Sequence, residues 1–180
     1  MKIGIDISQV AFEGTGVAEY AKSLVKGLLK LDKKNEYILF FSSLRRNFDP
    51  QMLNIKNLPS NLKVRVFKFP PLFLDFLWNR LHLAPIEWFI GKIDLFISSD
   101  WTEPPVVNAK KATILYDLIV YKYPKETDRE IIATQKRKLN WVKKESKIVF
   151  CISKATKKDA IEILGIEEKR LQVIYPGISY

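Results

Sequence analysis

Short apolar runs alternate with segments of helical periodicity along most of the chain. The runs that read as strands cover residues 2–7, 36–41, 62–67, 94–98, 112–116, 147–153 and 171–175. Between some of them, apolar residues recur at helical spacing over residues 17–31, 128–144 and 153–165. Because strands that alternate with helices favour a parallel sheet, we expect an α/β fold with helices on both faces of the sheet.

The length and composition fit one soluble-type globular domain over residues 1–180, since 47% of the residues are hydrophobic and 28% are charged. No apolar run approaches the roughly 20 residues that a membrane-spanning helix needs. The chain has one cysteine, Cys151, so it cannot form an internal disulfide. A cytoplasmic setting is therefore expected, because the cytoplasm keeps thiols reduced.

The formal net charge is +10, so the surface should attract anions such as nucleic acid, an anionic membrane face or a phosphorylated ligand. A lysine-rich surface that is merely solvated explains the charge equally well. The lysines are scattered along the chain and no nucleic-acid-binding motif accompanies them, so we expect no nucleic acid partner.

The stretch "GTGVAEY" places Gly14, Thr15 and Gly16 directly before an amphipathic helix. It is not a dinucleotide fingerprint, because residue 19 is a glutamate, and Val17 stands where a P-loop has its lysine. Two interpretations stay open: a plain strand-to-helix turn, or a site where the positive end of the helix holds an anion.

Ligands of open parallel sheets bind at the carboxyl ends of the strands. The polar residues near those ends are Asp100, Trp101 and Thr102 after 94–98, Tyr116 and Asp117 at the end of 112–116, and Ser153 and Thr156 at the end of 147–153. Each has a structural alternative: a packed loop aromatic, a turn former or a helix cap. Together they place polar groups at one edge of the expected sheet.

Residues 69–89 are rich in aromatic side chains, and basic residues lie beside them. The aromatic residues are Phe69, Phe73, Phe76, Trp78, Trp88 and Phe89. Pro85 should interrupt what would otherwise be one helix. The aromatic residues either pack a helix onto the sheet or form a surface for an anionic membrane. His82, the only histidine, is expected to be structural.

Four segments, in this order, carry a resemblance to a known family: "GTGVAEYAKSLVKGLL", "DLFISSDWTEPP", "ATILYDLIVYKYPKE" and "IVFCISKATKKDAIEILGIEEKRLQVIYPGI". The chain resembles the N-terminal domain of family 4 retaining glycosyltransferases, which have the GT-B fold. The likeness covers nearly all 180 residues. It implies a Rossmann-like domain that forms the N-terminal half of a GT-B fold.

In that family a C-terminal domain holds the nucleotide-sugar, the N-terminal domain mostly holds the acceptor, and no metal or other cofactor is normally needed. The resemblance assigns roles to the residues singled out above. Gly14, Thr15 and Gly16 approach the donor diphosphate, Asp100, Trp101 and Thr102 line the acceptor side, Tyr116 and Asp117 lie in the cleft near the reacting carbon, and Ser153 and Thr156 start a helix that faces the same cleft.

Two departures from the family pattern stand out. The family's His-Asp-Leu is Tyr116-Asp117-Leu118 here, and a tyrosine does not titrate near neutral pH.

The motifs that engage the donor belong to a second domain that residues 1–180 lack. The resemblance therefore implies a donor site shared with a C-terminal domain in cis or in trans, a chain that is inactive alone, and a glycan or lipid-linked acceptor. The alternative is a peripheral membrane-docking or non-catalytic binding module.

Overall fold

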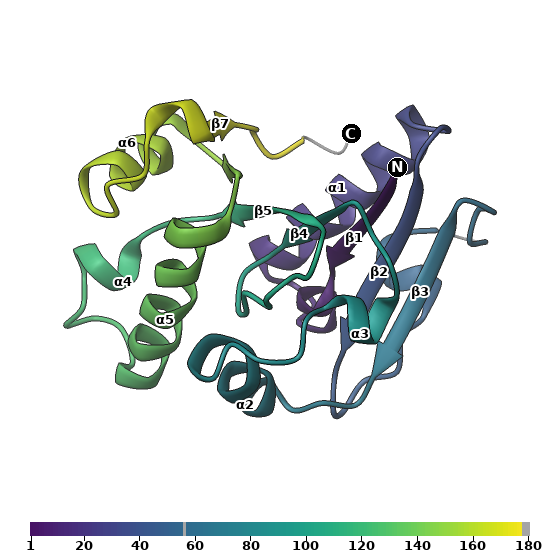
Figure 1. Ribbon diagram of the computed structural model, residues 1–180, viewed down its shortest axis with the longest axis horizontal. Coiled ribbons are helices and arrows are strands. Elements are labelled where there is room, and N and C mark those ends of the chain that lie inside the picture. The colour runs from purple at the N-terminus through teal and green to yellow at the C-terminus, as the bar shows by residue number, and fades with distance from the viewer. Residues whose placement is uncertain (56, 178–180) are drawn as a thin grey trace.

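Seven parallel strands form one sheet in the computed structural model, which describes residues 1–55 and 57–177 (Figure 1). Their order across the sheet is β3-β2-β1-β4-β5-β6-β7. The strands are β1 (Lys2–Asp6), β2 (Glu36–Ser42), β3 (Leu62–Phe67), β4 (Leu95–Ser98), β5 (Lys110–Leu115), β6 (Ile148–Cys151) and β7 (Leu171–Val173).

Burial along each strand follows its place in the sheet. The central strand β1 is buried from Ile3 onward on both faces, as its almost unbroken apolar run predicts. The alternating strand β3 lies at the edge, with Lys63 and Arg65 exposed to solvent. The sequence therefore separates central strands from the β3 edge correctly.

Helices follow most strands, as the alternating pattern predicts. The longer ones are α1 (Gly16–Leu31), α5 (Arg129–Glu145) and α6 (Lys154–Glu162). Each begins after a polar N-cap: the side chains of Thr15, Asp128 and Ser153 accept hydrogen bonds from backbone N–H groups of the first turn. The short helices are η1 (Ser8–Ala11), η2 (Pro50–Leu53), α2 (Pro71–Leu74), η3 (Asp75–Arg80), α3 (Glu87–Ile90), α4 (Ile119–Lys122) and η4 (Glu168–Arg170).

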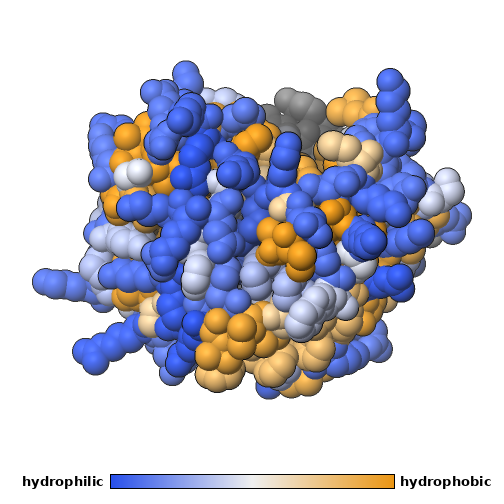
Figure 2. Space-filling view, viewed as in Figure 1, coloured by the Kyte–Doolittle hydropathy of each residue, from blue (hydrophilic) through white to orange (hydrophobic). Residues whose placement is uncertain are grey.

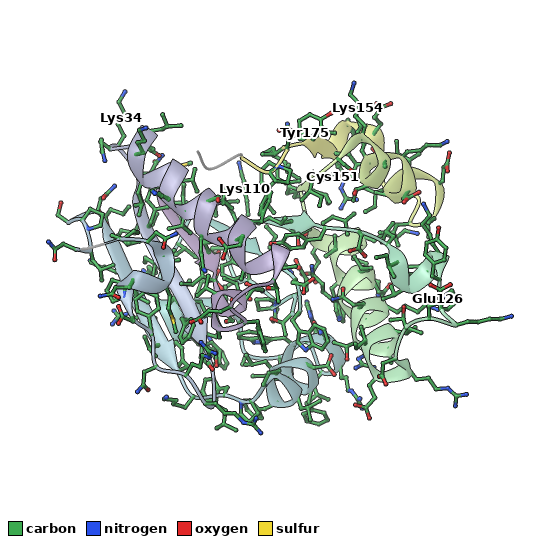
Figure 3. The ribbon with its side chains drawn as sticks, turned by 180° about the vertical axis from the view of Figure 1, so that it is seen from behind. Lys34, Lys110, Glu126, Cys151, Lys154 and Tyr175 are labelled. Atoms are coloured by element: carbon green, nitrogen blue, oxygen red, sulfur yellow. The ribbon has the colours of Figure 1, made fainter. Side chains whose placement is uncertain are left out.

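The helices cover both faces of the sheet. On one face, α1 packs Val25 and Leu29 into a core with Leu39 of β2, and Figure 3 shows α1 crossing in front of the strands. On the other face, Trp78 and Ile90 pack with strands β2 and β4, while α5 and α6 pack against β5 and β6. The expected Rossmann-like α/β fold is thus confirmed.

The segment over residues 70–92 differs from the expectation of one helix broken at Pro85. Its first helical part already ends at Arg80, and both His82 and Ala84 adopt left-handed backbone conformations, with φ of 53° and 58°. The His82 ring explains the turn, because Nδ1 lies 2.9 Å from the carbonyl oxygen of Trp78 and the ring stacks on Trp141 at 3.5 Å. The chain therefore turns several residues before the proline.

Two boundaries are also shorter than expected. Strand β6 covers Ile148–Cys151 rather than residues 147–153. Helix α6 ends at Glu162 because Gly165, with a φ of 64°, forms a glycine cap in which Ile166 N donates to the carbonyl oxygen of Ala160. Within the described part of the chain, no helix is long and apolar enough to cross a membrane.

Candidate functional site

A cavity of about 250 Å³ lies at the carboxyl ends of β4 and β5, between the start of α1 and helices α4 and α5. Its walls are formed by Val17, Asp100, Trp101, Ile114, Leu115, Tyr116, Asp117, Ile119, Val120, Thr127, Ile131, Gln135 and Lys138. This is the edge of the sheet at which parallel α/β proteins bind their ligands.

A second hollow, of about 300 Å³, lies near the amino ends of β2 and β3 and is lined by Glu36, Tyr37, Ser60, Asn61 and Lys63. None of the residues predicted for the site lines it. The smaller cavity is the better candidate because it combines the carboxyl edge of the sheet with residues from several segments of the chain.

Four of the predicted residues meet in the cavity: Asp100, Trp101, Tyr116 and Asp117. They come from loops after two neighbouring strands, which the parallel pairing of β4 with β5 places side by side. Thr102, the third residue predicted for the acceptor side, is buried and does not line the cavity. The structure thus brings together the residues at both strand ends but turns Thr102 inward.

Tyr116 is held rigidly at the cavity wall. Its hydroxyl lies 2.9 Å from Ser99 Oγ, and its ring meets Tyr20 of α1 edge-on, with the centroids 5.5 Å apart. Burial raises the pKa of Tyr116 above its usual range, and the charge of Asp100 acts in the same direction. Tyr116 therefore stays a neutral hydrogen-bonding group across the physiological pH range.

The two aspartates of the cavity have different environments. Asp117 is exposed and its Oδ1 accepts a hydrogen bond from Ile119 N at 3.0 Å, so it also fixes the turn into α4. Asp100 is tied to α5 by Gln135, whose Nε2 donates to the Asp100 carbonyl oxygen at 3.0 Å. Burial raises the pKa of Asp100, and Lys138 opposes this shift.

Lys138 and Gln135, both on α5, are site residues that the sequence analysis missed. Lys138 is only 2% exposed, and its Nζ donates to the carbonyl oxygen of Ser99. Burial lowers the pKa of Lys138, while the charges of Glu103 and Asp100 oppose the shift. Its position could have revealed it, because a lysine four residues before the apolar Val142 lies on the buried face of the helix.

The glycine loop, which comprises Gly14, Thr15 and Gly16, lies next to the cavity, since Val17 directly after it is part of the wall. The backbone at position 14 has a φ of 80°, a left-handed conformation that favours glycine. Thr15 caps α1 by accepting a hydrogen bond from Ala18 N at 3.2 Å. A Cβ atom at Gly16 would meet no other atom within 4 Å. The loop is therefore both a helix-starting turn and an exposed helix end with open space in front of it.

Ser153 and Thr156 do not line the cavity. Ser153 Oγ accepts a hydrogen bond from Thr156 N at 3.0 Å, and Thr156 Oγ1 donates to the carbonyl oxygen of Tyr116 at 3.0 Å. The pair caps α6 and holds the end of β5 in place. The geometry gives these two residues a supporting role beneath Tyr116, and the expectation that they face the cleft stays a prediction.

The cavity offers an indole, a phenol, carboxylates, an amide and the ammonium group of Lys138, which together can form hydrogen bonds with a ligand rich in hydroxyl groups. Among residues 1–55 and 57–177, no group of three or more His, Cys, Asp or Glu side chains is placed to hold a metal ion. The expectation that no metal takes part stays a prediction.

Comparison with known proteins decides the family. Residues 14–180 match the sequence profile of Glycosyltransferase Family 4. The chain belongs to glycosyltransferase family 4. This confirms the resemblance stated from the sequence motifs. No protein of curated function matches the chain.

The fold of this family 4 chain is also similar to that of a solved structure, the apo form of UGT2 from Phytolacca americana. The TM-score is 0.50 at 12% sequence identity, and the likeness covers 98% of this chain. It covers 52% of the other chain, so the family 4 chain spans about half the length of that protein. The likeness supports the expected GT-B half as a fold.

Proposed function

We propose that the chain is the acceptor-side half of a retaining glycosyltransferase. The enzyme transfers a sugar from a nucleotide-diphosphate sugar to a hydroxyl group of a glycan or a lipid-linked sugar. The observation that carries the proposal is the cavity at the carboxyl ends of β4 and β5, where Trp101, Tyr116 and Asp117 meet next to the glycine loop. Family membership supplies the reaction class.

In this proposal the cavity holds the acceptor sugar. Trp101, which is partly exposed, offers an apolar face for the C–H side of a sugar ring. The exposed carboxylate of Asp117 accepts hydrogen bonds from sugar hydroxyls. Tyr116 orients one hydroxyl and does not act as a base, because its raised pKa keeps it neutral.

The donor is shared with a C-terminal domain, supplied in cis or in trans. The start of α1 approaches the donor diphosphate, whose negative charge the positive helix end stabilises. As the bond from the anomeric carbon to the diphosphate breaks, the acceptor oxygen bonds to that carbon on the same face. The leaving phosphate takes the proton of the acceptor hydroxyl, so no metal, cofactor or protein base is required.

Several further features belong to the proposal. The chain alone is inactive, it takes no nucleic acid partner, and it works in the cytoplasm, where its single cysteine, buried in β6, stays reduced. The competing proposal is a non-catalytic glycan-binding module, which would use the same cavity without transferring a sugar.

The proposal is tested with the chain joined to its C-terminal domain, by steady-state sugar transfer from a panel of nucleotide-sugars. Trp101→Leu and Asp117→Asn should raise the KM for the acceptor roughly tenfold and leave the KM for the donor within about twofold. Val107→Ala, an exposed site outside the cavity, is the control. Absence of transfer with every donor would contradict the enzyme, and retained glycan binding would then favour the binding module.

A further inference from the structure

One stretch of the chain exposes several large apolar side chains together. It comprises α2, η3, α3 and the turns between them, and its exposed members are Leu72, Phe73, Phe76, Leu81, Leu83 and Trp88. We refer to these six residues as the apolar surface. Trp88 is 75% exposed and Leu72 is 72% exposed, and Figure 2 shows hydrophobic side chains gathered at the lower edge, over α2. Gatherings of this kind mark interaction sites.

The apolar surface rests on a rigid base. Phe89 meets the ring of Trp78 at 5.6 Å, and both rings pack against Phe40 of β2. The left-handed conformations of His82 and Ala84 place Leu81 and Leu83 outside this base. Some aromatic residues of this stretch therefore pack onto the sheet, while Phe73, Phe76 and Trp88 face solvent.

The exposed charged side chains within residues 62–93 all have one sign. Residues 62–93 contain Lys63, Arg65, Lys68, Arg80 and Lys92, all exposed to solvent. The same stretch has two acidic residues, and both are used inside the fold. Asp75 is buried beneath Arg137 at 2.6 Å, and Glu87 Oε1 accepts hydrogen bonds from three backbone N–H groups of residues 107–109. Of these basic residues, Lys68 precedes Phe69 directly. Arg80 lies within η3, where its Nε is 3.5 Å from Asp75 Oδ2 while its side chain stays 55% exposed.

We propose that the apolar surface docks the chain onto an anionic lipid bilayer. Exposed Leu, Phe and Trp side chains enter the boundary between headgroups and acyl chains, while Lys68 and Arg80 contact lipid phosphates. The absence of an exposed acidic side chain in residues 62–93 favours an anionic partner over a neutral one. A bilayer accepts exposed apolar side chains without a pocket of matching shape.

The segment that carries the apolar surface is hydrogen-bonded to the loop after β4, which holds Asp100 and Trp101 and which we call the acceptor loop. Asn79 of η3 donates from Nδ2 to the carbonyl oxygen of Trp101 at 3.1 Å, and its Oδ1 accepts from Glu103 N at 3.0 Å. A docked chain therefore holds the loop with Asp100 and Trp101 near the membrane surface. Resting on the proposed function, this position selects a lipid-linked sugar as acceptor.

The test is co-sedimentation of the 180-residue chain with vesicles of phosphatidylcholine alone, or with about 30% phosphatidylglycerol. The chain should pellet with the anionic vesicles and stay in solution with the neutral ones. Trp88→Ala should lower the partition coefficient roughly tenfold, and Leu31→Ala, which removes an 85% exposed leucine at the end of α1, should leave it unchanged. Thermal unfolding of each variant shows that it still folds.

Two double variants test the contribution of the basic residues to vesicle binding. Lys68→Gln with Arg80→Gln should weaken binding about fivefold for each residue removed. Lys30→Gln with Lys34→Gln should weaken the binding much less. Lys30 lies in the last turn of α1, and Lys34, labelled in Figure 3, lies just after that helix. Equal losses in the two pairs would show that net charge alone drives the binding.

Other occupants of the surface would give different results. Self-association that Trp88→Ala abolishes would assign the surface to a second copy of the chain. Binding to an acidic polypeptide but not to anionic vesicles would assign it to a protein partner. Either result, or no lipid-dependent pelleting, overturns the proposal. Vesicle binding requires no sugar transfer, so its failure is distinct from failure of the proposed function.

Discussion

Asn79 lies within hydrogen-bond distance of the loop after β4, with its Nδ2 atom 3.1 Å from the carbonyl oxygen of Trp101. Its Oδ1 accepts a hydrogen bond from Glu103 N in the same loop, and the whole side chain is buried. One side chain thus joins the segment that carries the apolar surface to the loop that lines the cavity. The acceptor loop has its shape because η3 supports it.

Replacing this residue should loosen the loop. Asn79→Ala leaves the buried N–H of Glu103 and the carbonyl of Trp101 without their partner, which should cost about 2–4 kcal/mol of unfolding free energy. Urea unfolding measures this loss. Asn108→Ala, at an exposed site, should change the unfolding free energy by less than about 0.5 kcal/mol. Equal effects of the two variants would contradict the supporting role.

The glycine loop permits a clean separation of function from folding. A Cβ at Gly16 meets nothing within 4 Å, so Gly16→Ala should fold normally. In the enzyme with both domains it should slow transfer at least tenfold, because the added methyl group crowds the donor diphosphate.

Gly27 is the matched control, since it lies in the middle of α1 and a Cβ there is equally free of contacts. Gly27→Ala should stabilise the helix by about 0.5–1 kcal/mol and leave transfer unchanged. If Gly16→Ala transfers sugar at the normal rate, the loop is a turn and not a diphosphate site.

Tyr116 stands where the family has a histidine. The pH profile of kcat/KM should therefore lack the ionisation that a histidine at this position would add. Because burial raises the pKa of Tyr116, this residue stays protonated at every pH below its usual range. Tyr116→His should add an ionisation at about pH 6–7 to the profile of kcat/KM for the acceptor. Tyr116→Phe, which loses the contact to Ser99 Oγ, should show no such ionisation. A profile identical in all three proteins would place residue 116 outside the reaction.

Glu145 should make the fold sensitive to acid. Burial raises the pKa of Glu145, but the hydrogen bond and charge of Lys111, followed by His82, outweigh burial and leave the pKa below its ordinary value of 4.5. A lowered carboxyl pKa stabilises the fold above about pH 4.5, and this contribution is lost as the pH falls through the folded-state pKa.

Urea unfolding at about pH 6 and pH 3 measures this effect. Wild-type protein should lose more unfolding free energy over that interval than Glu145→Gln does. Glu126→Gln, at an exposed site in the loop before α5, should behave like wild type. If Glu145→Gln loses as much as wild type, the Lys111 pair does not contribute to acid sensitivity.

The fold follows from the sequence because each signal is local. The caps at Thr15, Asp128 and Ser153 each act within one helix. The alternation along β3 and the mostly apolar runs of β1 and β2 each act within one strand. The turn at His82 is different, because a distant residue, Trp141, fixes its ring. A reading of residues 70–92 alone assigns that break to Pro85.

For the candidate site too, local signals predict part of the arrangement, and distant contacts determine the rest. Strand ends place Asp100, Trp101, Tyr116 and Asp117 correctly, because the order of a parallel sheet brings consecutive carboxyl ends together. Lys138 reaches the cavity from a helix packed over the sheet, and its role depends on tertiary contact with Ser99. Spacing along the chain does not show that contact, and it likewise does not show that Thr156 supports Tyr116 from beneath.

We propose that this chain holds the acceptor and that the donor is held mainly by a second domain. Isothermal titration of the 180-residue chain with uridine and guanosine diphosphate sugars tests it directly. We expect a Kd weaker than about 1 mM for the chain alone, because the start of α1 by itself supplies only part of a diphosphate site. A Kd of about 1–10 μM for the chain alone would contradict it and move the donor site into this domain.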